Sequence, residues 1–166
     1  MGKKGISPII ASVLIITLTI AGIAIIAGFI IPFVRESLGG ATECLPYQTY
    51  FSFDETFGFN CFEGGEIKLS IRANPLQREA SELNEFRVVF IGEAGSESVT
   101  VKDGAPPGEV VLLDAEGDNL KVPGIGEVRT YVYSGGTNFK SMEVYPVLES
   151  GRICEVSDSI NLRVCL

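Results

Sequence analysis

The sequence lacks the residues and spacings on which most enzyme sites are built. It contains no histidine, which removes Ser-His and Cys-His dyads and the commonest metal ligand of proteins. None of its four cysteines forms a C-x-x-C pair, so the spacing of a structural zinc site is absent. The chain also has no Walker loop, no dinucleotide fingerprint and no N-x-S/T sequon. We therefore expect a protein that is not an enzyme, with no catalytic, cofactor-binding or metal-binding residues.

Basic residues are scarce after the first forty positions. Residues 41–166 contain 10 Lys and Arg against 20 Asp and Glu, a net charge of −10. Such a charge repels nucleic acid and anionic lipid surfaces. We expect no nucleic-acid partner, and we expect the acidic balance to keep an exported surface soluble.

Three short stretches come closest to ligand-binding motifs. They are an acidic run at residues 114–119 and glycine-rich stretches at 124–126 and 134–137. In the acidic run the glycine is misplaced for an EF-hand loop, and Ile125 stands where the bidentate glutamate belongs. We expect all three stretches to be turns.

A long apolar run occupies the N-terminal fifth of the chain. Residues 5–34 carry no charge, and 17 of the 29 residues at 6–34 are Ile, Leu, Val or Phe. Membrane insertion of this run is favourable by roughly 8 kcal/mol, at about 0.5 kcal/mol per large apolar residue. As a helix it measures roughly 43 Å, which exceeds a bilayer core of about 30 Å. Part of the helix must therefore project beyond the lipid.

The charges that flank the run set its orientation. Lys3 and Lys4 precede it, and Arg35 is the only basic residue close behind it. The positive-inside rule places the short N-terminus in the cytoplasm and the rest of the chain outside the cell. Pro8 suits the first turn of a helix, with Ser7 before it as a cap.

Several uses of such a run remain open. A cleaved secretory signal has an apolar region of about 7 to 15 residues, half the length found here, although Gly39 and Ala41 form a small-x-small cleavage pattern. A lipoprotein signal is excluded because Glu43 precedes Cys44 where a small residue is required. A permanent membrane anchor is a second possibility. The third is a helix that first lies in the membrane and is then transferred into a bundle of identical helices.

Small side chains favour the third possibility. Thr17, Ala21, Ala24 and Gly28 recur at helical spacing and lie on one face of the predicted helix. A stripe of this kind lets helix backbones approach closely. The alternative is that these are ordinary small residues of a solitary anchor.

The chain begins with a basic leader and a Ser-Pro pair ahead of the apolar run. Residues 3–11, Lys-Lys-Gly-Ile-Ser-Pro-Ile-Ile-Ala, followed by unbroken Ile, Leu, Val, Thr and Ala, resemble the N-terminus of archaeal type IV pilin precursors. In that family a membrane aspartic peptidase, prepilin peptidase, removes the leader just before the hydrophobic helix. The resemblance implies cleavage between Gly5 and Ile6, which makes residues 1–5 a leader peptide. It covers about 34 of the 166 residues and says nothing direct about the outer domain.

The resemblance also implies a function. The chain is expected to be a structural subunit, a major or minor pilin, of an archaeal type IV pilus-like extracellular filament that serves surface adhesion. Its partners would be the membrane before assembly, prepilin peptidase, the pilus assembly machinery and identical subunits. Bacterial type IV pilins usually carry Glu at the fifth mature position, where this chain has Ile10. The alternatives are an archaellin-like motility filament subunit, although archaellins usually lack the Ser-Pro opening, and a permanently anchored extracellular β-sandwich that binds a ligand or surface.

All four cysteines follow the apolar run, as expected of an exported domain with two disulfides. Three pairings of Cys44, Cys61, Cys154 and Cys165 are possible, and sequence alone cannot choose among them. We favour Cys44 with Cys61 and Cys154 with Cys165, because closing loops of that size stabilises a small domain by roughly 3 kcal/mol each. Four buried free thiols are the alternative.

The composition after residue 40 predicts a β domain, so the fold class is α+β. We expect a hydrophobic helix at 6–38, a hinge and aromatic-rich segment at 39–65, and an immunoglobulin-like β-sandwich at 66–166. The clearest strand is 66–72, where Ile67, Leu69 and Ile71 alternate with polar residues. The other predicted strands are 86–91, 98–102, 110–114, 128–133, 142–148 and 160–166.

Two further expectations concern the ends of this domain. In the last predicted strand Ile160, Leu162, Val164 and Leu166 lie on one face, and Cys165 lies on the other, where it can staple an edge or a covering loop. Seven of the fifteen aromatic residues fall within residues 47–62. They are expected either to cover one end of the domain or to be buried against a neighbouring subunit.

Overall fold

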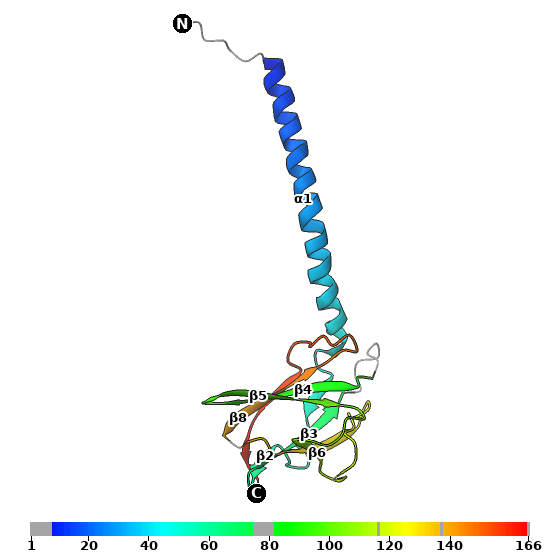
Figure 1. Cartoon of the computed structure of the whole chain (residues 1–166), viewed down its shortest axis with the longest axis vertical. Coiled ribbons are helices and arrows are strands. Elements are labelled where there is room, and N and C mark those ends of the chain that lie inside the picture. The colour runs from blue at the N-terminus through cyan, green and yellow to red at the C-terminus, as the bar shows by residue number, and fades with distance from the viewer. Residues whose placement is uncertain (1–7, 75–81, 116, 137, 166) are drawn as a thin grey trace. The chain divides into compact units, whose positions relative to one another are not determined.

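The computed structural model contains one long helix followed by two β-sheets (Figure 1). It describes residues 8–74, 82–115, 117–136 and 138–165, without the side chains of residues 8 and 35–41. The chain divides into two compact units, Met1–Glu43 and Cys44–Leu166. The α+β class is therefore confirmed, with an apolar N-terminal helix and a separate β unit.

Helix α1 (Pro8–Cys44) is longer than expected. At about 1.5 Å per residue its 37 residues extend for roughly 55 Å. The predicted end at residue 38 and the predicted hinge from residue 39 are wrong, because the helix runs through Gly39 and Gly40. Glycine lowers helix propensity by about 1 kcal/mol but keeps its amide donor, so it does not force a break. The α-helix ends before Leu45 and Pro46, since the residue before a proline disfavours the α conformation. A short 3₁₀ turn, η1 (Leu45–Tyr47), follows.

The larger sheet has six strands, in the order β10-β2-β3-β7-β6 with β1 also paired to β3. All pairs are antiparallel except the parallel pair of β10 and β2. Since β7 occupies one edge of β3, the strands β1 and β2 must share the other edge, β2 at its start and β1 at its end. The six strands are β1 (Phe51–Phe53), β2 (Cys61–Glu63), β3 (Glu66–Ala73), β6 (Val110–Leu112), β7 (Val128–Tyr133) and β10 (Arg163–Val164).

The smaller sheet has four antiparallel strands in the order β5-β4-β8-β9. Its central strand β4 alternates as a half-buried strand should, with Phe86, Val88 and Phe90 buried and the residues between them half-buried. A two-residue turn joins β4 to β5. The four strands are β4 (Glu85–Gly92), β5 (Gly95–Lys102), β8 (Phe139–Pro146) and β9 (Asp158–Asn161).

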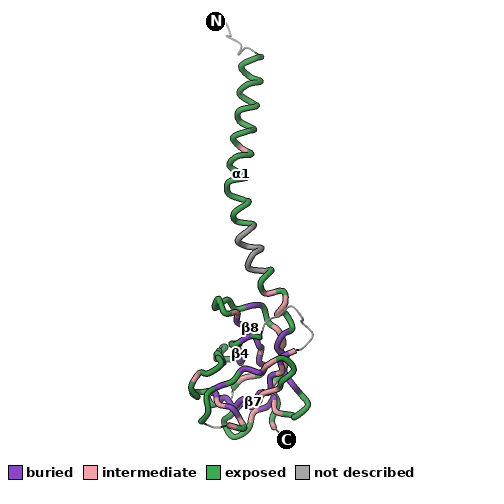
Figure 2. The backbone as a smooth tube through the Cα atoms, turned by 90° about the vertical axis from the view of Figure 1, so that its right-hand side faces the viewer, coloured by how far each residue is buried: buried purple, intermediate pink, exposed green. Residues whose placement is uncertain are grey.

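Aromatic side chains join the two sheets into one core. The Phe86 ring of β4 lies 5.5 Å from the Tyr131 ring of β7, and the Phe90 ring stacks on the Tyr133 ring at 4.4 Å. The Phe51 ring of β1 lies 5.1 Å from the Phe86 ring. Figure 2 shows that the buried residues gather in the β unit, whereas none of the described residues of α1 is buried and nearly all are exposed. The β unit thus has its own hydrophobic core.

The last predicted strand is in fact two short strands in different sheets. β9 pairs with β8 in the smaller sheet, and β10 pairs with β2 in the larger one. Between them the Leu162 amide donates to the Lys140 carbonyl at 2.8 Å, which marks the crossing point. The prediction that these residues form one apolar face of a single strand is therefore wrong. Ile160 and Leu162 pack against the core, whereas Val164 is 61% exposed. Leu166 lies outside the described residues.

The aromatic-rich segment divides between interior and surface. Tyr50, Phe51 and Phe53 are buried in the core, and Tyr47 and Phe62 pack against it. Phe57 is 61% exposed, and Phe59 is half-buried outside the core cluster. Most of these aromatic residues therefore belong to the β unit itself. Burial against a neighbouring subunit remains an expectation only for Phe57 and Phe59.

Candidate functional site

From Ile9 to Val34 the surface of α1 is apolar on every side. Ile9–Val34 has a mean hydropathy of 2.8, is long and apolar enough to cross a membrane, and none of it is buried within the chain. Large side chains such as Ile15, Ile20 and Phe29 are all exposed. A helix that is hydrophobic all round is one that other molecules cover, either lipid or protein. The described chain supplies no such cover.

The hydroxyl groups on this surface are hydrogen-bonded within the helix itself. Between Ile9 and Val34 they are Ser12, Thr17 and Thr19. Each hydroxyl donates to a backbone carbonyl one turn earlier, on Ile9 for Ser12, on Val13 and Leu14 for Thr17, and on Ile16 for Thr19, at 2.8–3.0 Å. Hydroxyls satisfied in this way enter an apolar medium without an unpaired donor. The helix is therefore suited to a dry environment along its whole apolar length.

The predicted small-residue stripe lies within the described helix. Thr17, Ala21, Ala24 and Gly28 are all exposed, at the spacing of one helical face. A Cβ built on Gly28 meets nothing within 4 Å, so nothing inside the chain requires glycine there. Pro32 has no amide to donate to the Gly28 carbonyl four residues earlier. The predicted cleavage residues Gly5 and Ile6 lie outside the described residues.

All four cysteines form disulfides, but the favoured pairing was wrong. The bonds are Cys44–Cys154 and Cys61–Cys165, with Cα–Cα distances of 5.4 and 5.0 Å. The expectation joined cysteines that are close in sequence, whereas the fold brings the end of α1 to the segment after β8 and brings β2 to the C-terminus. Cys165 does staple an edge, as predicted, because it is bonded to Cys61 in β2, the neighbour of β10.

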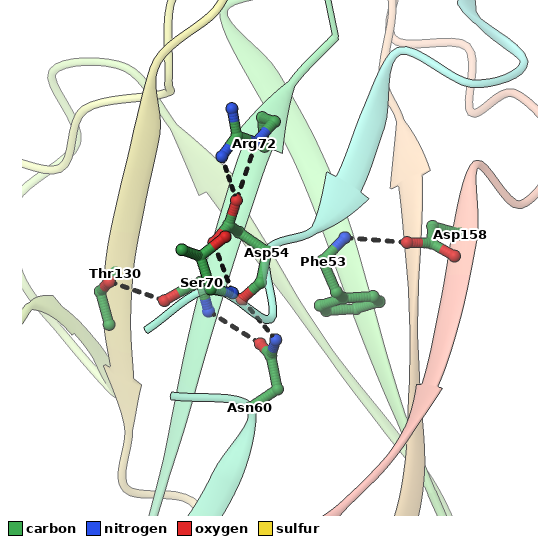
Figure 3. Close-up of polar contacts among 8 residues, drawn as sticks. Phe53, Asp54, Asn60, Ser70, Arg72, Thr130 and Asp158 are labelled. Carbon is green, nitrogen blue, oxygen red and sulfur yellow. Dashed lines mark hydrogen bonds and ion pairs between the residues drawn. The ribbon is translucent and has the colours of Figure 1, made fainter. Parts of the chain in front are cut away.

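Residues 54–60, here called the aromatic loop, leave the edge of β3 between β1 and β2 and are held by buried polar groups (Figure 3). The Asp54 amide donates to the Ser70 carbonyl at 2.9 Å, and the Ser70 amide donates to the Asn60 side-chain oxygen at 2.9 Å. The Asn60 side-chain amide in turn donates to the Asp54 carbonyl. Asn60 thus replaces the missing strand neighbour of β3 at Ser70, and all three residues are buried.

An ion pair completes the base of the aromatic loop. Arg72 donates to the Asp54 carboxylate through Nε at 2.8 Å and also through its terminal nitrogen. The Asp54 side chain is only 4% exposed. Burial alone would raise the pKa of Asp54, but the hydrogen bonds from Arg72 and Thr56 outweigh it and hold this pKa below its ordinary value. Asp54 is therefore charged and fixed at neutral pH.

Two open grooves flank the aromatic loop, and both are lined by Phe57 and Phe59. The first, of about 330 Å³, is lined further by Cys61, Glu63, Lys68, Arg163, Val164 and Cys165. The second, of about 420 Å³, is lined further by Arg72, Leu113, Asp114, Val128, Arg129 and Thr130. The loop therefore places the exposed Phe57 and the half-buried Phe59 between two grooves.

Two of the three stretches predicted as turns contain glycines in a turn conformation. Gly117 of the acidic run and Gly126 have positive φ angles of 96° and 81°, as turns require. Glu116 and Thr137 lie outside the described residues. Within the described ranges no three acidic or cysteine side chains are placed to hold a metal ion.

Comparisons with known protein families, with curated proteins and with solved structures give no match for this chain.

The sequence analysis did not identify Asp54, Asn60 and Arg72. Their hydrogen bonds and ion pair form only because strands β1 and β2 share one edge of β3.

Proposed function

We propose that the chain is the structural subunit of an extracellular filament of the archaeal type IV pilus kind, built around a core of α1 helices. The observation that carries this proposal is an apolar helix surface, Ile9–Val34, that no part of the described chain covers. Exposing it to water costs about 25 cal/mol for each Å² of apolar area. Lipid covers this surface before assembly, and copies of the same helix cover it afterwards.

Three features support filament packing beyond simple anchoring. The Ile9–Val34 span of 26 residues is roughly 39 Å long, about 9 Å more than a bilayer core requires. The stripe at Thr17, Ala21, Ala24 and Gly28 allows close approach of neighbouring helices. The disulfides of the β unit agree with a location outside the cell. We interpret the two sheets as a β-sandwich in the outer layer of the filament, and the immunoglobulin-like arrangement stays a prediction.

Intact-mass analysis of sheared filaments tests the function. We expect sheared material to contain this chain beginning at Ile6, with both disulfides formed. A full-length chain in filaments would reject the proposed leader. Absence of the chain from filaments, with all of it retained in the membrane fraction after shearing, would favour the permanently anchored binding domain.

A substitution on the stripe separates membrane insertion from helix packing. Ala24→Leu keeps the helix apolar but adds bulk where backbones approach, so we expect normal membrane fractionation and at least a tenfold lower filament yield. Ala27→Leu is the matched control, because Ala27 lies about a quarter turn from the stripe. Equal filament yields from the two variants would show that close helix packing does not depend on this stripe.

A further inference from the structure

The exposed apolar side chains of the β unit are concentrated beside its two disulfides. Six large apolar side chains are exposed in the described part of this unit. Five of them form two groups, and only Ile125 lies elsewhere. Single exposed apolar residues are ordinary, whereas grouped ones mark interaction surfaces.

The first group, here called the Cys61 patch, consists of Phe57, Phe59, Arg163 and Val164. These residues line the same groove as the Cys61–Cys165 disulfide. Phe57 and Val164 are each 61% exposed. The loop that carries Phe57 is closed at its base by the hydrogen bond between the buried Asn60 and Asp54, which limits the backbone entropy that binding costs. An exposed aromatic residue and an arginine in one groove are the composition typical of an interface centre.

The second group, here called the Cys44 patch, consists of Leu45, Ile153, Glu155 and Val156. Each lies one or two residues from Cys44 or Cys154, which are bonded to each other. Leu45, Ile153 and Val156 are 54%, 43% and 45% exposed. Glu155 is exposed between Cys154 and Val156.

The two patches lie at opposite ends of β8. Leu162, just before Arg163, donates to the Lys140 carbonyl near the start of β8. Cys154 donates to the Pro146 carbonyl at the end of β8. Six residues of strand separate these contacts, a distance of roughly 20 Å. One patch therefore cannot cover the other within a single molecule.

The charges of the patches are complementary. Arg163 and Glu155 make no ion pair within the described part of the chain. The groove of the Cys61 patch carries Lys68, Arg163 and Glu63, a formal charge of +1, whereas the charged residues within two positions of Cys44 or Cys154 are Glu43, Arg152 and Glu155, a formal charge of −1. A basic, aromatic surface on an acidic domain is attracted to another face of the same domain on a second molecule.

We infer that, in the filament proposed above, the Cys61 patch of one copy binds the Cys44 patch of a neighbouring copy. The apolar side chains of the two patches meet, and Arg163 pairs with Glu155 across the contact. Because the two patches differ, the contact is heterologous, and a contact of this kind can repeat from copy to copy along a filament. The inference rests on the proposed function and adds a second contact outside the α1 core.

Truncation of the apolar residues tests the contact in full-length chains. Filaments are sheared from cells, warmed stepwise in mild detergent and centrifuged, and released subunits are measured in the supernatant. For Phe57→Ala and Ile153→Ala we expect about tenfold more released subunit than for the wild type. Ile125→Ala is the control, since Ile125 is as exposed as Ile153 but belongs to neither patch. Thermal unfolding of each monomer in detergent verifies that the β unit still folds.

A charge exchange tests which surfaces pair. Arg163→Glu and Glu155→Arg are each expected to increase the released subunit about two- to fivefold, as for an exposed ion pair. The double variant R163E/E155R should return to the wild-type level. K121E/E155R is the control double variant and should not, because Lys121 lies in neither patch and makes no ion pair in the described chain.

The outcomes separate the two proposals. Wild-type cells without filaments of this chain would overturn the proposed function and the contact with it. Wild-type filaments that release no more subunit after Phe57→Ala and Ile153→Ala than after Ile125→Ala would overturn the contact alone. A silent Glu155→Arg, or a double variant that is not restored, would overturn the pairing of these two patches.

Discussion

The helix and the β unit place their apolar residues in opposite ways. Phe29 of α1 is 78% exposed, whereas Phe90 of β4 is fully buried between two sheets. In the β unit the hydrophobic free energy is gained within one chain, as soon as the sheets meet. In α1 it is gained only when lipid or another molecule covers the helix. Burial of the apolar residues of the β unit therefore stabilises the fold of the monomer, whereas burial of those of α1 stabilises the contact with lipid or with another molecule.

The hydrogen bonds of polar side chains also differ between the helix and the β unit. In the Ile9–Val34 part of α1 the hydroxyls donate to backbone carbonyls of the same helix. In the β unit Asp54, Asn60 and Ser70 bond to one another between the neighbouring segments β1, β2 and β3. The hydrogen bonds of Ser12, Thr17 and Thr19 thus need no tertiary structure, whereas those of Asp54, Asn60 and Ser70 require it.

The largest expected effect comes from the same truncation made in both regions. Phe90→Ala should lower the free energy of unfolding of the β unit by about 3–5 kcal/mol, because it leaves a cavity in the core. Phe29→Ala should change it by less than about 0.5 kcal/mol. Denaturant unfolding of the full chain in detergent, followed by near-ultraviolet circular dichroism, measures both. Equal destabilisation by the two variants would break the comparison.

Removal of one disulfide is expected to have the next largest effect. C61S/C165S and C44S/C154S should each lower the free energy of unfolding of the β unit by about 2–5 kcal/mol and leave the helicity of α1 unchanged. The matched control is C44S/C61S, which breaks both bonds in this pairing. Thiol labelling should find no free thiol in the first two variants and two in the control; the reverse pattern of free thiols would contradict the pairing.

Sequence reasoning succeeded where a pattern is local. The alternation of Ile67, Leu69 and Ile71 predicted β3 within one residue, and the bounds of β7 agree with the prediction. The uninterrupted apolar run likewise predicted α1, because its signal is contained in one segment.

The rest could not be predicted because it depends on which strands share an edge. Cys44 and Cys61 are close in sequence, yet each is bonded to a partner more than 100 residues away. β1 and β2 have three residues each, too few to show a period. The hydrogen bonds of Asn60 at Ser70 arise only after both strands have paired with β3, so the candidate surface at Phe57 has no signal in the sequence beyond its aromatic content.

A smaller effect is expected at the buried carboxylate. Asp54→Asn keeps the shape but removes the charge that binds Arg72, and it should cost about 1–3 kcal/mol. Because the folded pKa of Asp54 is below its ordinary value, its stabilising effect is present above about pH 4 and is lost as the pH falls through the folded value. The variant should therefore show a flatter loss of stability below pH 4 in acid unfolding. Glu63→Gln is the control, because the hydrogen bond from Lys68 also lowers the pKa of Glu63 but the pair is exposed and screened by solvent; it should flatten the acid loss less than Asp54→Asn does.

The smallest expected effect concerns Tyr133, at the end of β7. Its hydroxyl donates to Glu97 of β5 at 2.8 Å, across the two sheets, and burial together with this hydrogen bond raises the pKa of Tyr133 to about 12. Since an unfolded tyrosine ionises near pH 10, the unfolded chain loses its proton first, and stability falls between about pH 10 and 12. Tyr133→Phe removes one hydrogen bond but leaves the stacking on Phe90, so it should cost about 0.5–1.5 kcal/mol at neutral pH and weaken the alkaline loss. The difference between ultraviolet titrations of the folded wild type and of the folded Tyr133→Phe variant isolates this phenol from the other four tyrosines. A phenol at this position that ionises near pH 10 would mean that the two sheets are less tightly joined here than the stacked rings indicate.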